Sequence, residues 1–269
     1  MTLMTADAPG RRVAVVTGAS SGIGEATARL LAERGWHCVL LARREDVLRS
    51  LASEIGGEVE ACDVADRAAV ALTASHILER HSAVHLLVNS AGFLARGSFV
   101  DAPLDLIERA LAVNYLGGVW TTRGLLPGLR EAAQASGRAH VVTIASIGGE
   151  IVFTPAAPYS ASKHAQVAFS RSLRAALLGT GIEVHTILPG FVTTPGFPHP
   201  KFFASRLGRR FVVGPERVAR EVISAIENGK AEVVVPWFPY GLGPIAQAIV
   251  PTLTARVLRH AEYADDPTT

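Results

Sequence analysis

Residues 13–24 read VAVVTGASSGIG, an apolar run that passes directly into a turn with three glycines. The apolar run suits a strand that is buried on both faces. Gly18 permits the tight turn, Gly22 lets the backbone approach a pyrophosphate, and Gly24 lets the next helix pack close to the strand. The phosphates would lie at the positive end of that helix. The stretch predicts a dinucleotide site made by Gly18, Ser20, Ser21, Gly22, Ile23 and Gly24.

Apolar runs alternate with helical stretches along the chain as far as residue 235. The expected strands are Val13–Val16, Cys38–Leu41, Val59–Cys62, Leu86–Val88, Val141–Ile144, Val184–Leu188 and Glu232–Val235. The expected helices are Gly24–Arg34, Glu45–Ile55, Arg67–Arg80, Leu104–Leu126, Tyr159–Leu178 and Pro215–Asn228. Strand–helix–strand repetition implies right-handed crossovers. We therefore expect one doubly wound, Rossmann-type α/β domain with a seven-stranded parallel sheet and helices on both faces.

The expected domain covers residues 11–235, with a flexible N-terminal tail at 1–10 and an apolar C-terminal extension at 236–269. A hydrophobic content of 49% is enough for the sizeable core that such a domain needs.

The end of the second strand indicates which nicotinamide cofactor binds. An acidic residue there would hold the ribose 2′-hydroxyl of NAD, whereas an arginine accommodates the 2′-phosphate of NADP. This chain has Ala42 at the strand end, followed by Arg43 and Arg44. Guanidinium groups match a phosphate with several donors. We therefore expect NADP(H), with both arginines beside the adenine ribose.

Tyr159 and Lys163 are four residues apart at the start of an expected helix, which places them on one face. A free tyrosine, with a pKa of about 10, is a poor base at neutral pH. A nearby ammonium stabilises the phenolate and brings the pKa toward the working range. Ser146 follows the fifth strand and lies at the sheet edge where ligands bind, so its hydroxyl could hold a substrate oxygen.

With these residues the chain resembles the short-chain dehydrogenase/reductase family over roughly residues 11–235. Asp63-Val64 looks like that family's adenine-binding pair. Asn89-Ser90-Ala91-Gly92 resembles its Asn-Asn-Ala-Gly motif, with Ser90 in place of the second Asn. Pro189-Gly190-Phe191-Val192-Thr193-Thr194 looks like the nicotinamide clamp. The resemblance implies cofactor contacts from Asp63, Val64, Asn89, Ala91, Gly92, Tyr159, Lys163, Pro189, Gly190, Val192 and Thr194.

The resemblance also implies a catalytic set of Asn114, Ser146, Tyr159 and Lys163. Asn114 would hold a water in a proton relay. Ser146 and Tyr159 would bond the carbonyl oxygen, and Tyr159 would deliver or take the proton. Lys163 would bond the nicotinamide ribose and lower the pKa of the tyrosine.

Three stretches should form the walls of the substrate pocket, namely residues 93–100, 148–158 and 191–213. They carry few charges and many large apolar side chains, which are Phe93, Leu94, Ile151, Val152, Phe153, Phe191, Phe197, Phe202 and Phe203. Pockets are commonly apolar with a few placed polar groups. We expect a small apolar carbonyl compound or alcohol as substrate.

Charge and cysteine content exclude other classes of function. A net charge of +2 with dispersed basic residues gives no nucleic-acid footprint. Cys38 and Cys62 form no disulfide framework or metal spacing and are expected to be buried apolar residues. His81 and His85 straddle a helix–strand junction, so no metal site is expected. Without an apolar leader at its N-terminus, the chain is expected in the cytoplasm, as a homodimer or homotetramer.

The C-terminal extension is unusual because no charged residue occurs from Val233 to Ala255. That length would span a bilayer, but four prolines argue against one continuous helix. The segment would instead cover the pocket mouth, pack on a second subunit, or lie on a membrane surface.

Other functions remain open beside the expected oxidoreductase. A 3-oxoacyl-carrier reductase is a specific rival within the same enzyme class. A nucleotide-sensing binding protein would use the same fold without catalysis, and a membrane-associated interaction protein would use the uncharged extension. A nucleoside-triphosphate loop is excluded, because no Gly-Lys-Ser/Thr follows the first glycines.

Overall fold

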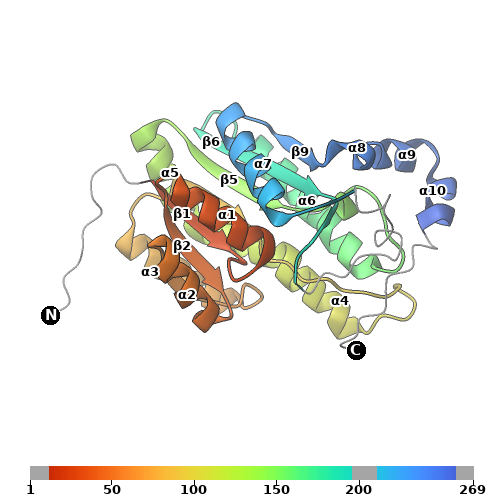
Figure 1. Ribbon diagram of the computed structural model, residues 1–269, viewed down its shortest axis with the longest axis horizontal. Coiled ribbons are helices and arrows are strands. Elements are labelled where there is room, and N and C mark those ends of the chain that lie inside the picture. Colours follow the sequence, from red (N-terminus) through yellow and green to blue (C-terminus); the bar gives the residue numbers. More distant parts are fainter. Residues whose placement is uncertain (1–11, 196–210, 259–269) are drawn as a thin grey trace.

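The computed structural model describes residues 12–195 and 211–258. Its central feature is a seven-stranded sheet in the order β3-β2-β1-β4-β5-β6-β9. All neighbouring strands pair in parallel. The strands are β1 (Val13–Thr17), β2 (His37–Ala42), β3 (Glu58–Ala61), β4 (Leu86–Asn89), β5 (Ala139–Ile144), β6 (Ile182–Pro189) and β9 (Glu232–Val235). The expected fold class is confirmed (Figure 1).

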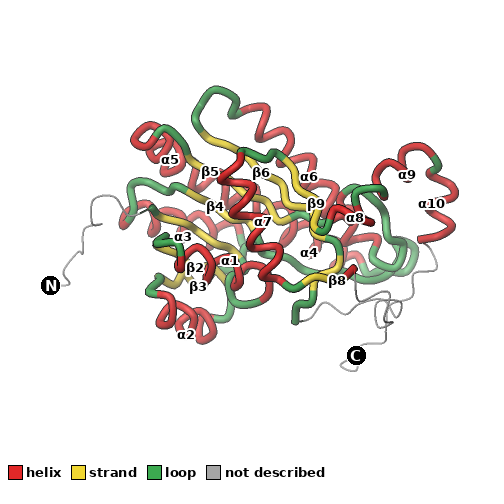
Figure 2. Tube along the Cα trace, turned by 45° about the horizontal axis from the view of Figure 1, so that its top comes forward, coloured by secondary structure: helices red, strands yellow, loops and turns green. Residues whose placement is uncertain are grey.

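Helices cover both faces of this sheet (Figures 1 and 2). On one face α1 (Gly22–Glu33) packs between α2 (Glu45–Ile55) and α7 (Pro215–Asn228). The other face carries α3 (Arg67–Arg80), α4 (Leu104–Leu111), α5 (Gly117–Ser136) and α6 (Ala157–Ala176). The strand order reverses at β1, because β2 and β3 lie on one side of it and β4 lies on the other. In such sheets a ligand-binding crevice opens at this point, at the carboxyl ends of the strands.

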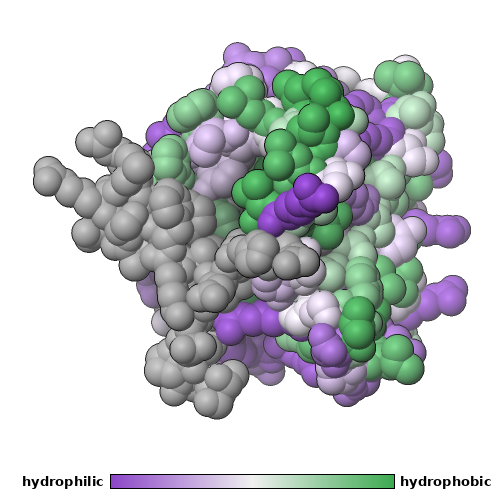
Figure 3. Space-filling view, turned by 90° about the vertical axis from the view of Figure 1, so that its right-hand side faces the viewer, coloured by the Kyte–Doolittle hydropathy of each residue, from purple (hydrophilic) through white to green (hydrophobic). Residues whose placement is uncertain are grey.

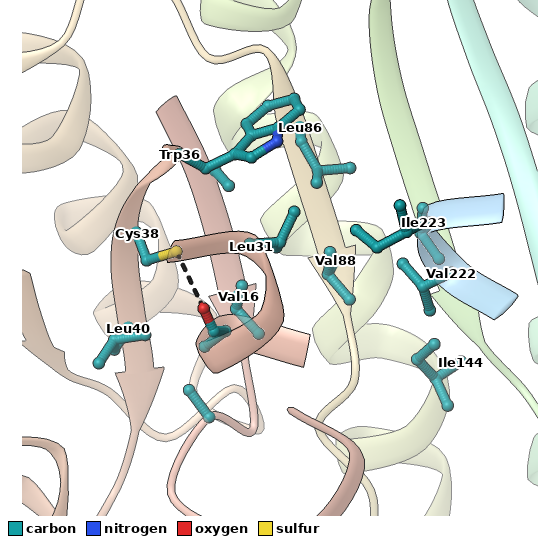
Figure 4. Packing of buried hydrophobic residues seen from close by; sticks show 14 of the residues in the cluster. Val16, Leu31, Trp36, Cys38, Leu40, Leu86, Val88, Ile144, Val222 and Ile223 are labelled. Atoms are coloured by element: carbon teal, nitrogen blue, oxygen red, sulfur yellow. Dashed lines mark hydrogen bonds between the residues drawn. The ribbon is translucent and has the colours of Figure 1, made fainter. Parts of the chain in front are cut away.

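Two buried clusters hold the layers together. The first joins the sheet to α1, α2 and α7, and Figure 4 shows Leu31 of α1 and Ile223 of α7 over the strands. In it, Cys38 Sγ lies 3.5 Å from the carbonyl oxygen of Ala28. The second joins the sheet to α3 and α5. Both cysteines are buried, as expected, and neither is in a disulfide bond.

The expected single helix over Leu104–Leu126 is wrong in two respects. A π-helical turn, η1 (Ala112–Leu116), separates α4 from α5. In addition, α5 continues through Pro127 to Ser136. Proline removes one helical hydrogen bond, but the turn after it buries Leu129 and its neighbours in the core. This packing outweighs the tendency of proline to end a helix.

A second, two-stranded sheet pairs β7 (Phe191–Val192) with β8 (Val212–Val213), and the sequence pattern did not indicate it. The C-terminal extension forms α8 (Trp237–Tyr240), α9 (Gly243–Ile249) and α10 (Pro251–Leu258). Among the described residues, none of the helices is both long and apolar enough to cross a membrane. Tails 1–10 and 259–269, and the expected pocket residues Phe197, Phe202 and Phe203, lie outside the described residues.

Candidate active site

A pocket of about 440 Å³ lies at the carboxyl edge of the sheet, beside the glycine-rich turn. Most of the predicted cofactor residues line it together: Gly18, Ser20, Ser21, Gly22, Ile23, Gly24, Arg43, Arg44, Asp63, Val64, Ala91, Gly92, Tyr159, Lys163 and Thr194. The predicted residues that do not line it are Asn89, Asn114, Ser146, Pro189, Gly190 and Val192. The crevice thus collects residues from five strand ends and from α6.

The glycines of the turn allow contacts that a side chain would block. Gly18 has a φ of +67°, and a Cβ there would lie 2.8 Å from the backbone of Ala91. A Cβ on Gly22, whose φ is +59°, would lie 2.8 Å from Thr194 Cγ2. Gly24 packs on the turn itself, where a Cβ would lie 2.4 Å from the Gly18 carbonyl oxygen. Helix α1 follows without a side-chain cap from Ser21, so its first N–H groups are available to phosphate oxygens.

The two arginines after β2 lie on the rim of the pocket. Arg44 donates from Nη2 to the carbonyl oxygen and the Oγ of Ser20, at 3.1 and 3.0 Å. Arg43 Nη1 lies 3.9 Å from Asp63 Oδ2, and its side chain is exposed. Both guanidinium groups therefore lie at the expected adenine-ribose end of the crevice. Arg44 is bonded to the glycine-rich turn, and Arg43 lies near the Asp63 carboxylate.

Lys163 is buried one helical turn after Tyr159 in α6. Its Nζ donates to the Ile144 carbonyl oxygen at 3.0 Å and to Gln166 Oε1 at 2.8 Å. The Nζ lies 5.7 Å from the centroid of the Tyr159 ring. Burial lowers the pKa of Lys163 to about 7. A phenolate on Tyr159 would favour the ammonium form, so the two groups are placed to influence each other's protonation.

Ser146 follows β5 and caps the short 3₁₀ helix η2 (Ile147–Gly149). Its Oγ accepts from the Gly148 N–H at 3.0 Å and lies 3.5 Å from the Pro189 carbonyl oxygen. A Cβ on Gly148 would lie 3.4 Å from both Ser146 Oγ and Tyr159 Cε1. The serine hydroxyl and the tyrosine ring therefore both lie next to Gly148.

Asn114 lies in the π-helical turn η1, and both its amide oxygen and its amide nitrogen bond to protein groups. Its Oδ1 accepts from the Phe93 N–H at 2.7 Å, and its Nδ2 donates to the Phe93 carbonyl oxygen at 2.9 Å and to Ser162 Oγ at 2.8 Å. Ser162 Oγ in turn donates to the Tyr159 carbonyl oxygen at 2.7 Å. Asn114 thus fixes the loop after β4 and the first turn of α6 relative to each other.

Asn89, at the end of β4, is buried and donates from Nδ2 to Thr122 Oγ1 at 3.0 Å. The N–H groups of Ser90 and Ala91 both donate to Thr17 Oγ1, at 3.0 and 3.1 Å. The turn after β4 is therefore held against β1 by two main-chain N–H groups that donate to the Thr17 side chain, and the serine at position 90 preserves this arrangement.

The segment after β6 connects the site to the C-terminal extension. Tyr240 of α8 packs against Gly190 so closely that a Cβ there would lie 2.1 Å from Tyr240 Cε2. Tyr240 also donates from its hydroxyl to the Phe211 carbonyl oxygen at 2.9 Å. It belongs to a buried cluster with Ile147, Ile151 and Phe191, and burial raises its pKa to about 12. The extension is thus packed against the segment that follows β6, although none of its described residues lines the pocket.

Two residues of the site were missed from the sequence. Gln166 holds Lys163, and the i,i+3 spacing could have indicated it. Arg109 lines the pocket, with its guanidinium carbon 5.4 Å from the centroid of the Phe93 ring. Arg109 belongs to α4, which was not among the stretches expected to form the pocket wall.

Comparisons with known proteins agree with this geometry. The family model described as short chain dehydrogenase matches residues 12–199. An uncharacterized oxidoreductase of Mycobacterium tuberculosis is 46% identical over 192 residues, covering 71% of this chain and 73% of the relative. The mouse dehydrogenase/reductase SDR family member 7B is 31% identical, covering 91% and 80%. The structure of an actinorhodin polyketide ketoreductase variant with NADPH has a TM-score of 0.73 at 30% identity, covering 87% and 97%.

Proposed function

The chain belongs to the short-chain dehydrogenase/reductase family of oxidoreductases, and from this premise we propose that it transfers a hydride between NADP(H) and the carbonyl or secondary alcohol of an apolar small molecule in the cytoplasm. The observation that carries the proposal is that Tyr159 and Lys163 line the cofactor crevice together, while the Ser146 hydroxyl and the Tyr159 ring lie on either side of Gly148.

The nicotinamide ring supplies or accepts the hydride when it is bound. In reduction, the Tyr159 phenol donates its proton to the carbonyl oxygen, while the Ser146 hydroxyl donates a hydrogen bond to the same atom. In oxidation, the Tyr159 phenolate takes the proton from the alcohol. The Lys163 ammonium, 5.7 Å from the centroid of the Tyr159 ring, would stabilise the phenolate. Asn114 positions Tyr159 through Ser162, and its part in a water relay stays a prediction.

The preference for NADP(H) rests on Arg43 and Arg44. Both line the pocket at the end of β2, where no carboxylate of that strand is present to accept from a ribose hydroxyl. A 2′-phosphate would bond to either guanidinium with charge assistance. The ketoreductase neighbour was solved with NADPH, which supports the same choice of cofactor.

The apolar character of the substrate is supported by Phe93, Leu94 and Val113, which line the pocket. A buried apolar cluster that contains Ile151, Phe191 and Tyr240 lies next to Ser146 through Ile147. Phe153 packs edge-on against Phe191, with ring centroids 6.0 Å apart. The similarity to a polyketide ketoreductase favours, as a second candidate, the reduction of a ketone on a carrier-bound acyl chain. Arg109 in the pocket would suit the negative charge of such a carrier.

The extension offers an apolar surface to a further partner. Figure 3 looks onto the end of the molecule that carries α8–α10 and shows apolar residues gathered there. The exposed large apolar side chains of the extension are Trp237, Phe238, Leu242, Ile245, Ile249, Val250, Leu253 and Val257. We propose that a second copy of the chain covers this surface in a homodimer or homotetramer. Sedimentation would give the oligomer, and flotation with lipid vesicles would instead show a membrane surface as the occupant.

A panel of apolar ketones, 3-oxoacyl thioesters and secondary alcohols, assayed with NADPH and NADH by nicotinamide absorbance, tests the proposed function. We expect turnover of at least one apolar ketone or alcohol with NADPH. Tight NADPH binding without turnover of any compound would favour the nucleotide-sensing binding protein instead. Turnover confined to thioesters would select the carrier-bound ketone.

A further inference from the structure

A cluster of two histidines and a carboxylate lies far from the cofactor crevice, near the amino ends of β5 and β6. His140 is the second residue of β5, and Glu183 and His185 are the second and fourth residues of β6. His140 pairs with Glu183 across the two strands, so all three side chains lie on the sheet face covered by α1 and α7. Both histidines are buried, whereas Glu183 is half-exposed.

The three potential ligand atoms form a small triangle. His140 Nδ1 lies 3.1 Å from His185 Nε2, and Glu183 Oε2 lies 3.8 Å from each of these nitrogens. The centre of this triangle is about 2.1 Å from all three atoms, which is the length of zinc bonds to imidazole nitrogen and carboxylate oxygen. A small rotation of the half-exposed Glu183 would bring the set from planar to tetrahedral geometry.

The protonation of the histidines suits metal binding. His185 Nδ1 lies 2.8 Å from the Lys230 carbonyl oxygen, which can only accept, so Nδ1 carries the proton and Nε2 presents a lone pair. Such a carbonyl partner on the second ring nitrogen is typical of metal-bound histidines. Both rings are buried in the sheet face, which disfavours a positive charge on either of them. His140 needs only to move its proton from Nδ1 to Nε2.

We propose that His140, Glu183 and His185 form a binding site for Zn²⁺ or a similar divalent transition metal, with a water in the fourth position. Two neutral imidazoles and one carboxylate are the ligands that zinc takes in open sites. Arg12 and Arg138 lie near His140, and Arg174 lies near His185. Arg12 and Arg138 are exposed, so solvent weakens their repulsion of a cation. The bound metal clamps β5 to β6 at the edge opposite the catalytic residues.

A second cluster on the same edge of the sheet provides a matched comparison. Glu58 accepts through Oε1 from His37 Nε2 at 2.6 Å and from His81 Nε2 at 3.0 Å. Its Oε2 accepts from Arg80 Nε at 3.1 Å. These three donors lower the pKa of Glu58 and occupy both carboxylate oxygens. The same residue types are therefore present, but the carboxylate is already used by a guanidinium.

Metal binding to tag-free, chelator-treated full-length protein tests the proposal. Co²⁺ titration should give the visible absorption of a tetrahedral complex at one ion per chain, and Zn²⁺ should displace it. Glu183→Gln should weaken binding at least about tenfold. The matched variant Glu58→Gln should bind Co²⁺ like the unaltered protein. Zn²⁺ should raise the unfolding temperature of the unaltered protein more than that of Glu183→Gln.

Several outcomes would overturn the site. These are binding that is not stoichiometric, binding that survives Glu183→Gln, and equal weakening by both variants. Because the Glu183 side chain is 45% exposed and lies far from the cofactor crevice, Glu183→Gln should fold and keep the NADPH affinity of the unaltered protein. Measuring that affinity separates loss of the metal site from general misfolding.

Discussion

Changing Ala42 to Asp together with Arg43 to Ala should narrow or reverse the preference for NADPH over NADH. The double change removes one guanidinium from the rim of the crevice and adds a carboxylate at the end of β2. That carboxylate would accept from the ribose 2′-hydroxyl of NADH and would repel the 2′-phosphate of NADPH. Arg44 keeps its contacts with Ser20, so part of the phosphate affinity remains.

The expected magnitude follows from the exposure of the arginine. A hydrogen bond to a charged group contributes about 1.5–3 kcal/mol, which corresponds to roughly a tenfold to hundredfold preference. The Arg43 side chain is 61% exposed, and its nearest acidic partner, Asp63, is 3.9 Å away. Solvent screening therefore places the expected loss of preference for NADPH near the lower limit, at about tenfold.

Titration of both cofactors by nicotinamide fluorescence gives the two dissociation constants for each variant. Arg49→Ala is the matched control, because Arg49 is an exposed arginine of α2 that pairs with Glu45 and does not line the crevice. Its cofactor affinities should equal those of the unaltered protein. Equal affinities for NADPH and NADH in the unaltered protein, or an unchanged ratio in the double variant, would refute the assignment.

Three further predictions concern stability and catalysis. The lowered pKa of Lys163 means that the unfolded chain binds a proton that the native protein lacks between about pH 7 and its ordinary pKa of 10.5, so stability rises with pH across this window. Lys163→Met should therefore stabilise the cofactor-free protein more at low pH than near pH 10 in thermal unfolding, and a pH-independent difference would contradict this. Gly190→Ala should cost about 1–3 kcal/mol by overpacking against Tyr240, and the loss should be smaller in a Tyr240→Leu background; strictly additive losses would count against direct contact. Ser146→Ala should lower kcat about 10²- to 10³-fold with little change in NADPH affinity, and an unchanged kcat would remove Ser146 from the reaction.

The fold was predictable because its strands are continuous Val- and Leu-rich runs between periodic helices. Val13–Thr17 and Glu232–Val235 lie where the pattern places them. The break in the helix after Leu104 was not predictable, since the π-helical turn follows from the bonds of Asn114 to Phe93 and Ser162, which are distant in sequence. The end of α5 was predicted too early, because burial of Leu129 outweighs the tendency of Pro127 to end a helix.

Most of the site was predictable because its residues follow strand ends in fixed local patterns. The i,i+4 spacing of Tyr159 and Lys163 and the turn after β1 are examples. Contacts between segments that are distant in sequence were not predictable, and the clearest case is the packing of Tyr240 against Gly190. The neighbouring histidines on β5 and β6 escaped for the same reason, because their register is set by the sheet and 45 residues separate them.

The central claim is that Tyr159 is the acid/base of a hydride transfer, and Tyr159→Phe tests it most directly. On a substrate identified with the unaltered protein, single-turnover rates and NADPH dissociation constants would be measured for both proteins. General acid/base catalysis typically raises a reaction rate about 10²- to 10⁴-fold. We therefore expect Tyr159→Phe to lower the single-turnover rate by a factor of that size and to leave the NADPH affinity nearly unchanged. A Tyr159→Phe protein that reduces the substrate at the unaltered rate would contradict the account.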